Sequence, residues 1–424
     1  MVTDTMRRMN TDTASPPNRG PALMLVLLAA AGTFALTMGA RQSMGLFLGP
    51  INTSTGLGLA SISLAFAFGQ LWWGLTQPLA GMVADRIGAG RVLLAGVLLV
   101  ALGTALIPFM HGTPGLVLAI GVLAAGGAGM AGPAVLMSAV NRLVPAERRG
   151  MATGIVNAGG SFGQFVFAPI AQGITAAAGW VVALQSLAAI TLLALPAAWV
   201  LRGNSQALAA AQPGGAETTG QAVKRALASR DYRLLAAGFF VCGFHVAFLA
   251  THLPGVVASC GLSPQVGAWA LAVLGLFNIA GSLGIGWAMG WRGGWWRLRS
   301  LLSLIYTVRA VGVVLFVLAP KTPAVLLAFA ALMGLSYLST VPPTAGLVAR
   351  MFGPAHMATL FGGVMLTHQV GGFLGAWLGG LVYQSTGGYG LMWALDVALA
   401  AAAALVHLPI REAVPAGRVQ AAAA

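Results

Sequence analysis

About twelve apolar segments, each long enough to cross a bilayer, follow one another along this chain of 424 residues. A hydrocarbon core about 30 Å thick needs roughly 20 apolar residues in helical form. The hydrophobic share of 58%, the charged share of 7% and the mean hydropathy of +0.87 lie outside the range of soluble domains. High Ala, Leu and Gly content favours helices over barrel strands. The sequence therefore predicts an all-α membrane protein with spans at 22–48, 59–84, 91–110, 115–140, 150–176, 180–201, 233–258, 265–290, 298–319, 323–349, 356–384 and 389–410.

The net charge of +14 is a topology signal. All Lys and Arg residues except Arg41, Arg309 and Lys321 fall in the tails or in alternate connections. Because positively charged loops stay on the cytoplasmic side, we expect both termini to be cytoplasmic. No loop is long enough for a nucleic-acid module, so we expect no nucleic-acid partner. Residues 1–20 lack a signal-peptide cleavage pattern, and we expect the first helix to be retained.

A polar connection divides the chain into two halves. Its Gly, Pro, Gln and Thr content predicts a flexible linker at 202–232 between helical bundles at 22–201 and 233–410, with cytoplasmic tails at 1–21 and 411–424. Aligning Pro50 with Pro254 superposes the first helices of the two halves and places Arg41 opposite His245. Two parallel six-helix repeats with polar residues at mid-membrane are typical of alternating-access carriers.

The connection GMVADRIGAGR at 81–91 carries a recognisable pattern of Gly81, Asp85, Arg86, Gly88 and Arg91. It resembles the cytoplasmic signature of the major facilitator superfamily. The resemblance implies two pseudo-symmetric six-helix bundles that rock about a central site, with this motif acting in gating. Glycines permit a tight turn, and the carboxylate accepts bonds that must break as the halves move. The counterpart GIGWAMGWRGGWW at 284–296 lacks the Asp.

Further runs are similar to bacterial relatives of the monocarboxylate transporters and the oxalate:formate antiporter. They are GARQSMGLF (39–47), SLIYTVRAVGVVLF (303–316), LSTVPPTAGLVARMFGP (338–354) and LFGGVMLTHQVGGFLGAWLGG (360–380). The better-known members of that group hold the substrate carboxylate with an Arg on helix eight. Here the corresponding region has Asn278 and Ser282 and no charge, and His368 lies near the position of the antiporter's helix-eleven Lys.

Two arginines are expected inside the membrane. A charge at that depth costs roughly 2.5–3.5 kcal/mol on insertion scales and marks a functional site by default. Arg41 has no acid in the first-half spans to neutralise it, which favours a substrate-facing role over a structural one. Arg309 and Asp396 both fall near mid-membrane on neighbouring helices, which favours a structural pair over a carboxylate-binding Arg309.

The remaining polar residues in the spans are neutral or titratable. His245, His368 and Asp396 are the candidates for proton coupling. Residues expected to contact substrate, besides Arg41 and, as the alternative, Arg309, are His245, His368, Gln369, Asn278, Tyr337, Gln70 and Asn157.

A cavity with an unneutralised arginine favours an anion, because a carboxylate matches the guanidinium fork. The leading hypothesis is therefore a secondary or facilitative carrier for a small organic anion, with a monocarboxylate first. The alternative is an efflux transporter for a larger amphipathic compound, with or without proton coupling. No hydrolase, kinase or Walker signature is present, so we expect no enzyme, cofactor or metal site. The excess of Arg over Lys suggests a bacterial inner-membrane protein, expected to be a monomer.

Overall fold

We describe a computed structural model of the protein over residues 20–144, 149–202, 218–290, 297–353 and 356–412. The described part is helical and contains no strand, and its helical segments correspond to the twelve predicted spans. Ten of them are long and apolar enough to cross a membrane. Of the tails predicted at 1–21 and 411–424, residues 1–19 and 413–424 lie outside the described residues.

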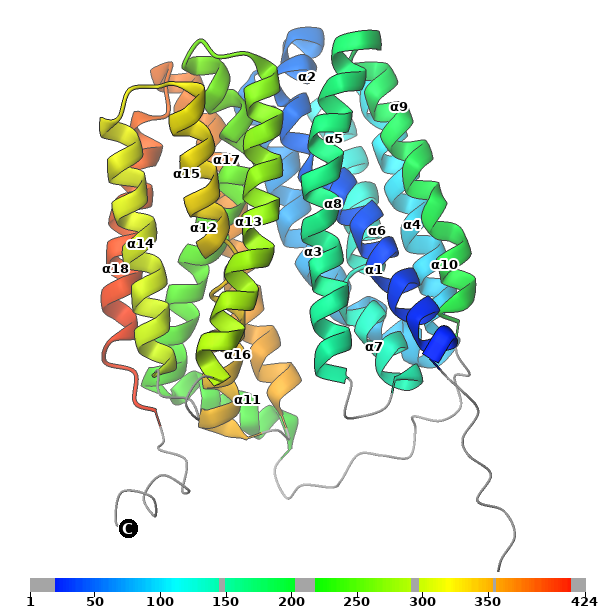
Figure 1. The fold of residues 1–424 in the computed structure, drawn as a ribbon, viewed down its shortest axis with the longest axis vertical. Helices are drawn as coiled ribbons and strands as arrows, with labels where there is room; N and C mark the ends of the chain where they lie inside the picture. Colours follow the sequence, from blue (N-terminus) through cyan, green and yellow to red (C-terminus); the bar gives the residue numbers. More distant parts are fainter. Residues whose placement is uncertain (1–19, 145–148, 203–217, 291–296, 354–355, 413–424) are drawn as a thin grey trace, which may run out of the picture.

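The first half of the chain contains six helical segments, some of them interrupted (Figure 1). They are α1 (Gly20–Gln42) with η1 (Met44–Phe47) and α2 (Leu48–Thr55); α3 (Leu59–Ile87); α4 (Ala89–Leu106) with η2 (Ile107–Phe109); α5 (Thr113–Leu116), η3 (Val117–Ala124), α6 (Ala125–Met130) and α7 (Pro133–Leu143); α8 (Arg149–Ala178); and α9 (Trp180–Thr191), η5 (Leu192–Ala194) and α10 (Leu195–Val200). The segment η3 is a π-helix, a geometry often found at functional sites.

The second half contains the other six segments. They are α12 (Arg230–Ser259), α13 (Pro264–Gly290), α14 (Leu298–Leu318), α15 (Pro323–Ser336) with α16 (Val341–Phe352), α17 (Met357–Thr386) and α18 (Gly390–His407). Helix α15 stops before Tyr337, and α16 starts one residue before the Pro342–Pro343 pair, since proline supplies no backbone N–H to continue the preceding turn.

The stretch predicted as a flexible linker differs from that expectation in part. Residues 219–228 form a helix, α11 (Thr219–Ala228), which begins with a capping box between Thr218 and Gln221. The alternation of apolar and basic residues gives this helix one buried face, on which Ala222 and Ala226 lie. Residues 203–217 lie outside the described part.

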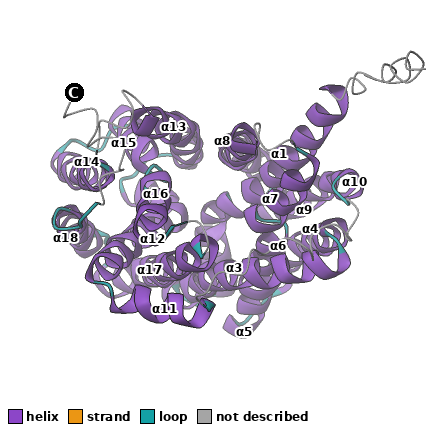
Figure 2. Cartoon of the chain, turned by 90° about the horizontal axis from the view of Figure 1, so that it is seen from below, coloured by secondary structure: helices purple, strands orange, loops and turns teal. Residues whose placement is uncertain are grey.

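Two helix pairs join the halves. Helix α3 packs along α17, and α8 packs along α13, as seen from below in Figure 2. Gly45 of η1 approaches the backbone of Ala250 on α12 so closely that a Cβ would clash with the carbonyl oxygen. The backbone N–H of Ala60 also donates to Oε1 of Gln384 across the halves, at 2.9 Å. Elements of both halves therefore meet around the last turn of α1.

Glycines account for close packing within the second half. Gly371, Gly375 and Gly379 recur every four residues on α17, and each lies directly against α12. Added Cβ atoms would meet the carbonyl oxygens of Phe240 and Phe244 at the first two positions. Small residues at this spacing let the backbones of the two helices approach closely.

Candidate functional site

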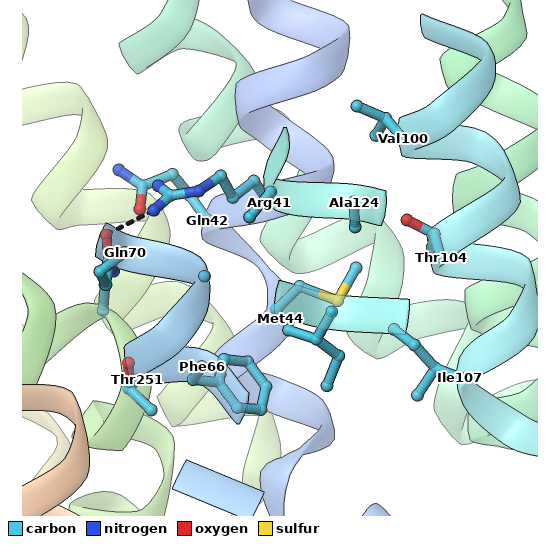
Figure 3. Close-up of a pocket in the computed structure, with 15 residues that line it drawn as sticks. Arg41, Gln42, Met44, Phe66, Gln70, Val100, Thr104, Ile107, Ala124 and Thr251 are labelled. Atoms are coloured by element: carbon cyan, nitrogen blue, oxygen red, sulfur yellow. Dashed lines mark hydrogen bonds between the residues drawn. The ribbon is translucent and has the colours of Figure 1, made fainter. Parts of the chain in front are cut away.

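A small pocket lies beside the last turn of α1, where Arg41 is located (Figure 3). Its walls come from α1, η1, α3, α4, η2, η3, α6 and α12, so both halves contribute to it. The cavity volume is about 40 Å³. Since one water molecule needs about 10–15 Å³ on this scale, the pocket accommodates a molecule of only a few heavy atoms.

Arg41 is half-buried on this wall and contacts neutral groups. One guanidinium nitrogen donates a hydrogen bond to Oε1 of Gln70 on α3 (Figure 3). The guanidinium carbon lies 4.8 Å from the ring centroid of Trp73, a distance suited to a cation–π contact. Within the described part of the chain, no carboxylate forms an ion pair with Arg41. The structure therefore brings the predicted residues Arg41 and Gln70 together and leaves the positive charge without an anionic partner.

Asp396 lies beside His245 and not beside Arg309, the partner expected from the sequence. Its Oδ1 lies 3.2 Å from Nε2 of His245, and both side chains are almost completely buried between α12 and α18. No ion pair joins Arg309 to Asp396 among the described residues, so the expected Arg309–Asp396 pair is not formed. The reason is the helix packing: α12 supplies an imidazole within reach of the carboxylate, and the guanidinium is occupied by other oxygens.

Arg309 contacts the backbone where the helix is interrupted between α15 and α16. Its Nη2 donates to the carbonyl oxygens of Ser336 and Tyr337, the latter at 2.7 Å, and lies 3.7 Å from Sγ of Cys242. The side chain is 1% exposed. These carbonyls have lost their helical partners because α15 ends at this point. The observed contacts therefore give Arg309 a structural role, although one nitrogen, Nη1, has no hydrogen-bond partner.

Asn278 and Tyr337, two of the predicted substrate contacts, are engaged by protein groups. Asn278 donates through Nδ2 to Oγ of Ser161 at 2.8 Å, which links α13 to α8 across the two halves. Its Oδ1 accepts from the backbone N–H of Leu338 at 3.1 Å. The Tyr337 hydroxyl donates to the carbonyl of Val246 at 2.9 Å. Both side chains are buried and stabilise the packing around the break.

The other predicted contacts are dispersed. Gln369 packs against Gly74 of α3 with its Nε2 unpartnered, and His368 is buried beside the Phe239 ring with its Nδ1 unpartnered. Asn157 is exposed on α8. None of the three lines the pocket that contains Arg41.

The predicted gating motif joins α3 to α4. Gly88 adopts a φ of 95°, which explains why glycine is needed at this turn. Arg86 and Arg91 are exposed, and Gly81 faces open space and is not a close-packing position here. The side chain of Asp85 lies outside the described residues, as do residues 291–296 of the second-half counterpart.

Three relevant residues were not anticipated from the sequence. Cys242 and Ser336 contact Arg309, and Thr104 lines the pocket beyond Arg41. The Pro342–Pro343 pair signals a helix break that needs a partner for free carbonyls. Nothing in the local sequence singles out Thr104, because threonine is common in apolar helices.

Comparisons with known proteins identify the family. The family model described as Major Facilitator Superfamily matches residues 28–308. Monocarboxylate transporter 13 of Rattus norvegicus is 26% identical over 402 residues, covering 93% of this chain and 90% of the relative. The oxalate:formate antiporter of Oxalobacter formigenes is 28% identical over 148 residues, 35% of each chain.

A solved structure shares the fold. The bacterial homologue of the human lysosomal transporter Spinster, in its inward-facing and occupied conformation, superposes with a TM-score of 0.66 at 16% identity, covering 92% of this chain and 95% of that chain. The family match extends over most of the chain, and the packed helical segments agree with it. The protein is a multi-pass membrane transporter and not an enzyme, and it belongs to the major facilitator superfamily.

Proposed function

We propose that this protein carries small organic anions, with monocarboxylates as the leading class, and that Arg41 binds the carboxylate. The observation that carries the proposal is a half-buried guanidinium on a pocket wall, with a neutral amide as its hydrogen-bond partner and no acid beside it. Such a group is well suited to a carboxylate, because the fork of N–H donors matches the two oxygens. The names of the relatives support the same class of substrate.

The pocket size favours a small substrate over a bulky one. In this conformation the cavity beside Arg41, of about 40 Å³, is closer in size to a short acid than to an amphipathic drug-like compound. Apolar residues, among them Met44, Phe66 and Ile120, surround the remainder of the pocket and suit a short hydrocarbon chain. These features support anion transport over the efflux alternative.

Transport is proposed to proceed by rocking of two six-helix bundles, 22–201 and 233–410. The pocket is lined from one half by Arg41 and from the other by Ala250 and Thr251. Relative movement of the halves therefore changes the pocket directly, as alternating access requires. The distribution of basic residues supports a bacterial inner-membrane location with both termini cytoplasmic.

Proton coupling is proposed at the His245–Asp396 pair. The two side chains approach to 3.2 Å without forming a hydrogen bond in this conformation, and no other described group hydrogen-bonds either carboxylate oxygen, so both groups are available to take up a proton. Arg309 of α14 is a charged residue that interacts electrostatically with both members of the pair. His368 remains a second coupling candidate.

Uptake in proteoliposomes tests the proposal. Purified protein should accumulate labelled lactate or propionate, and Arg41→Gln should raise KM at least about 30-fold, equivalent to about 2 kcal/mol. Arg41→Lys should retain part of the function, since it keeps the charge but not the fork. Arg202→Gln is the matched control, because Arg202 also stacks on a tryptophan, Trp199, but is exposed at the end of α10. Unchanged uptake by Arg41→Gln would overturn the role of Arg41.

A further inference from the structure

The Thr104 hydroxyl is buried without a hydrogen bond. Thr104 lies on α4 with 1% of its surface exposed, and its Oγ1 has no hydrogen-bond partner among the described residues. Two other buried threonines donate to the carbonyl four residues earlier, Thr37 to Thr33 at 2.9 Å and Thr191 to Leu187 at 2.8 Å, whereas the buried Thr344 of α16 is unpartnered like Thr104 but does not line this pocket. That local bond is the usual way to satisfy a hydroxyl in an apolar helix. Thr104 does not make it.

The unpartnered hydroxyl is on the pocket wall. Thr104 lines the same cavity as Arg41, and Figure 3 shows its oxygen pointing away from α4 toward the side that Ala124 and Met44 line. Its neighbours on this wall are apolar: Val100 and Ile107 from α4 and η2, and Ile120 and Ala124 from the π-helix. Thr104 is thus the polar side chain among the α4 and η3 residues that line the pocket.

The residues around Thr104 restrict which functional group of a substrate can lie beside its hydroxyl. Arg41 is the only cation among the described residues that line the pocket, so once one carboxylate binds there, a second carboxylate at the Thr104 hydroxyl would be buried without a counter-charge of its own. A hydroxyl or carbonyl group, in contrast, pairs with the Thr104 hydroxyl at little desolvation cost. A buried polar group that is satisfied only by the correct substrate discriminates strongly against an analogue that lacks the matching group.

We propose that Thr104 determines substrate specificity. Its hydroxyl hydrogen-bonds a neutral polar substituent of a short carboxylic acid, on the carbon farthest from the carboxylate. This inference rests on the proposed function, since it places the carboxylate at Arg41. It narrows the substrate class to short acids with a distal hydroxyl or carbonyl group, such as 3-hydroxy acids, over unsubstituted acids and dicarboxylates.

Three acids of equal chain length test the proposal: propionate, 3-hydroxypropionate and lactate. In proteoliposomes the unmodified protein should show a lower KM for 3-hydroxypropionate than for propionate. Thr104→Val, which keeps the shape but removes the hydroxyl, should reduce that preference about tenfold and leave the KM for propionate within about twofold. Thr104→Ser should retain the preference. Thr191→Val is the control, because it removes a buried threonine hydroxyl far from this pocket on α9.

The outcomes separate this inference from the proposed function. An unchanged ratio of the two KM values in Thr104→Val, with both acids transported and Arg41→Gln inactive, overturns only the role of Thr104. An equal loss for both acids also overturns it, because that result indicates a packing role. A preference for lactate over 3-hydroxypropionate that is lost in Thr104→Val contradicts the distal placement. Failure of the unmodified protein to transport any of the three acids refutes the anion-carrier proposal itself.

Discussion

The imidazole of His245 lies 3.2 Å from the carboxylate of Asp396, and 1% or less of either side chain is exposed. The pair connects the first and last helices of the second half, α12 and α18, at a depth where water does not compensate for a lost partner. The two intramembrane arginines differ in environment, since Arg309 is buried and Arg41 is half-buried.

The His245–Asp396 pair should behave as one energetic unit. Asp396→Leu alone leaves a buried imidazole without its partner, and should lower the free energy of unfolding by about 3 kcal/mol. The double variant His245→Leu/Asp396→Leu should lose much less than the sum of the singles, since an apolar pair of similar size is tolerated. Thermal unfolding in detergent measures the loss of stability in the two single variants and the double variant. If the loss in the double variant equals the sum of the single losses, the two side chains do not stabilise each other.

Proton coupling at this pair predicts a specific pH dependence. If the pair takes up a proton in each cycle, uptake should increase as the pH falls on the entry side, because proton and anion move together. His245→Gln should remove this dependence while preserving exchange between internal and external substrate. His252→Gln is a suitable comparison, because His252 is buried on the same helix but bonds to Ala376 and does not contact Asp396. A full pH response in His245→Gln would exclude the pair as the coupling site.

Arg309 should be important for stability rather than for substrate affinity. Arg309→Met leaves the carbonyls of Ser336 and Tyr337 unsatisfied at the helix break, and should cost about 2–4 kcal/mol of unfolding free energy. Arg41→Gln should leave thermal stability nearly unchanged, since Arg41 is only half-buried. Exchanging the residues at 309 and 396 should rescue neither single variant, because the two side chains form no ion pair. Rescue by the exchange would restore the original pairing hypothesis.

Asn278 should stabilise the conformation seen here. Asn278→Leu removes the 2.8 Å hydrogen bond to Ser161 between α13 and α8, and should increase the population in which these helices separate. Spin-label distances between the outer ends of α8 and α13 would detect the shift. Ser282→Ala is the control, since Ser282 makes only a 3.5 Å contact within α13. An unchanged distance distribution in Asn278→Leu would indicate that the bond does not bias the equilibrium.

Glu412 should hold the segment after α18 against the start of α14 and the end of α16, through Arg299 and Arg350. Its carboxylate accepts from the backbone N–H of Arg299 at 2.7 Å and pairs with Nη1 of Arg350 at 2.6 Å. Because Arg350 is partly exposed, Glu412→Gln should cost only about 1 kcal/mol of unfolding free energy. Arg411→Gln, at an exposed neighbouring position, should have no measurable effect on the melting temperature. Equal melting temperatures for the two variants would contradict this role of Glu412.

Much of this protein was determined by the sequence alone. Twelve apolar segments and the alternate placement of basic residues predict a multi-span helical carrier, because hydrocarbon permits few other ways to satisfy the backbone. The motif at 81–91 and the internal repeat predict the family. Arg41 was identified by the absence of any acid in its half of the membrane, and the structure places it on a pocket wall beside Gln70.

Tertiary structure decided which polar residues meet. Asp396 contacts His245 and not Arg309, since depth along a helix can be counted from sequence but rotation about its axis and the neighbouring helix cannot. The partner of Arg309 is a pair of main-chain carbonyls, which have no side-chain signature. Thr104 is a pocket residue because α4 packs against the π-helix η3 and together they form this part of the cavity wall, an arrangement that cannot be deduced from the sequence of α4 alone.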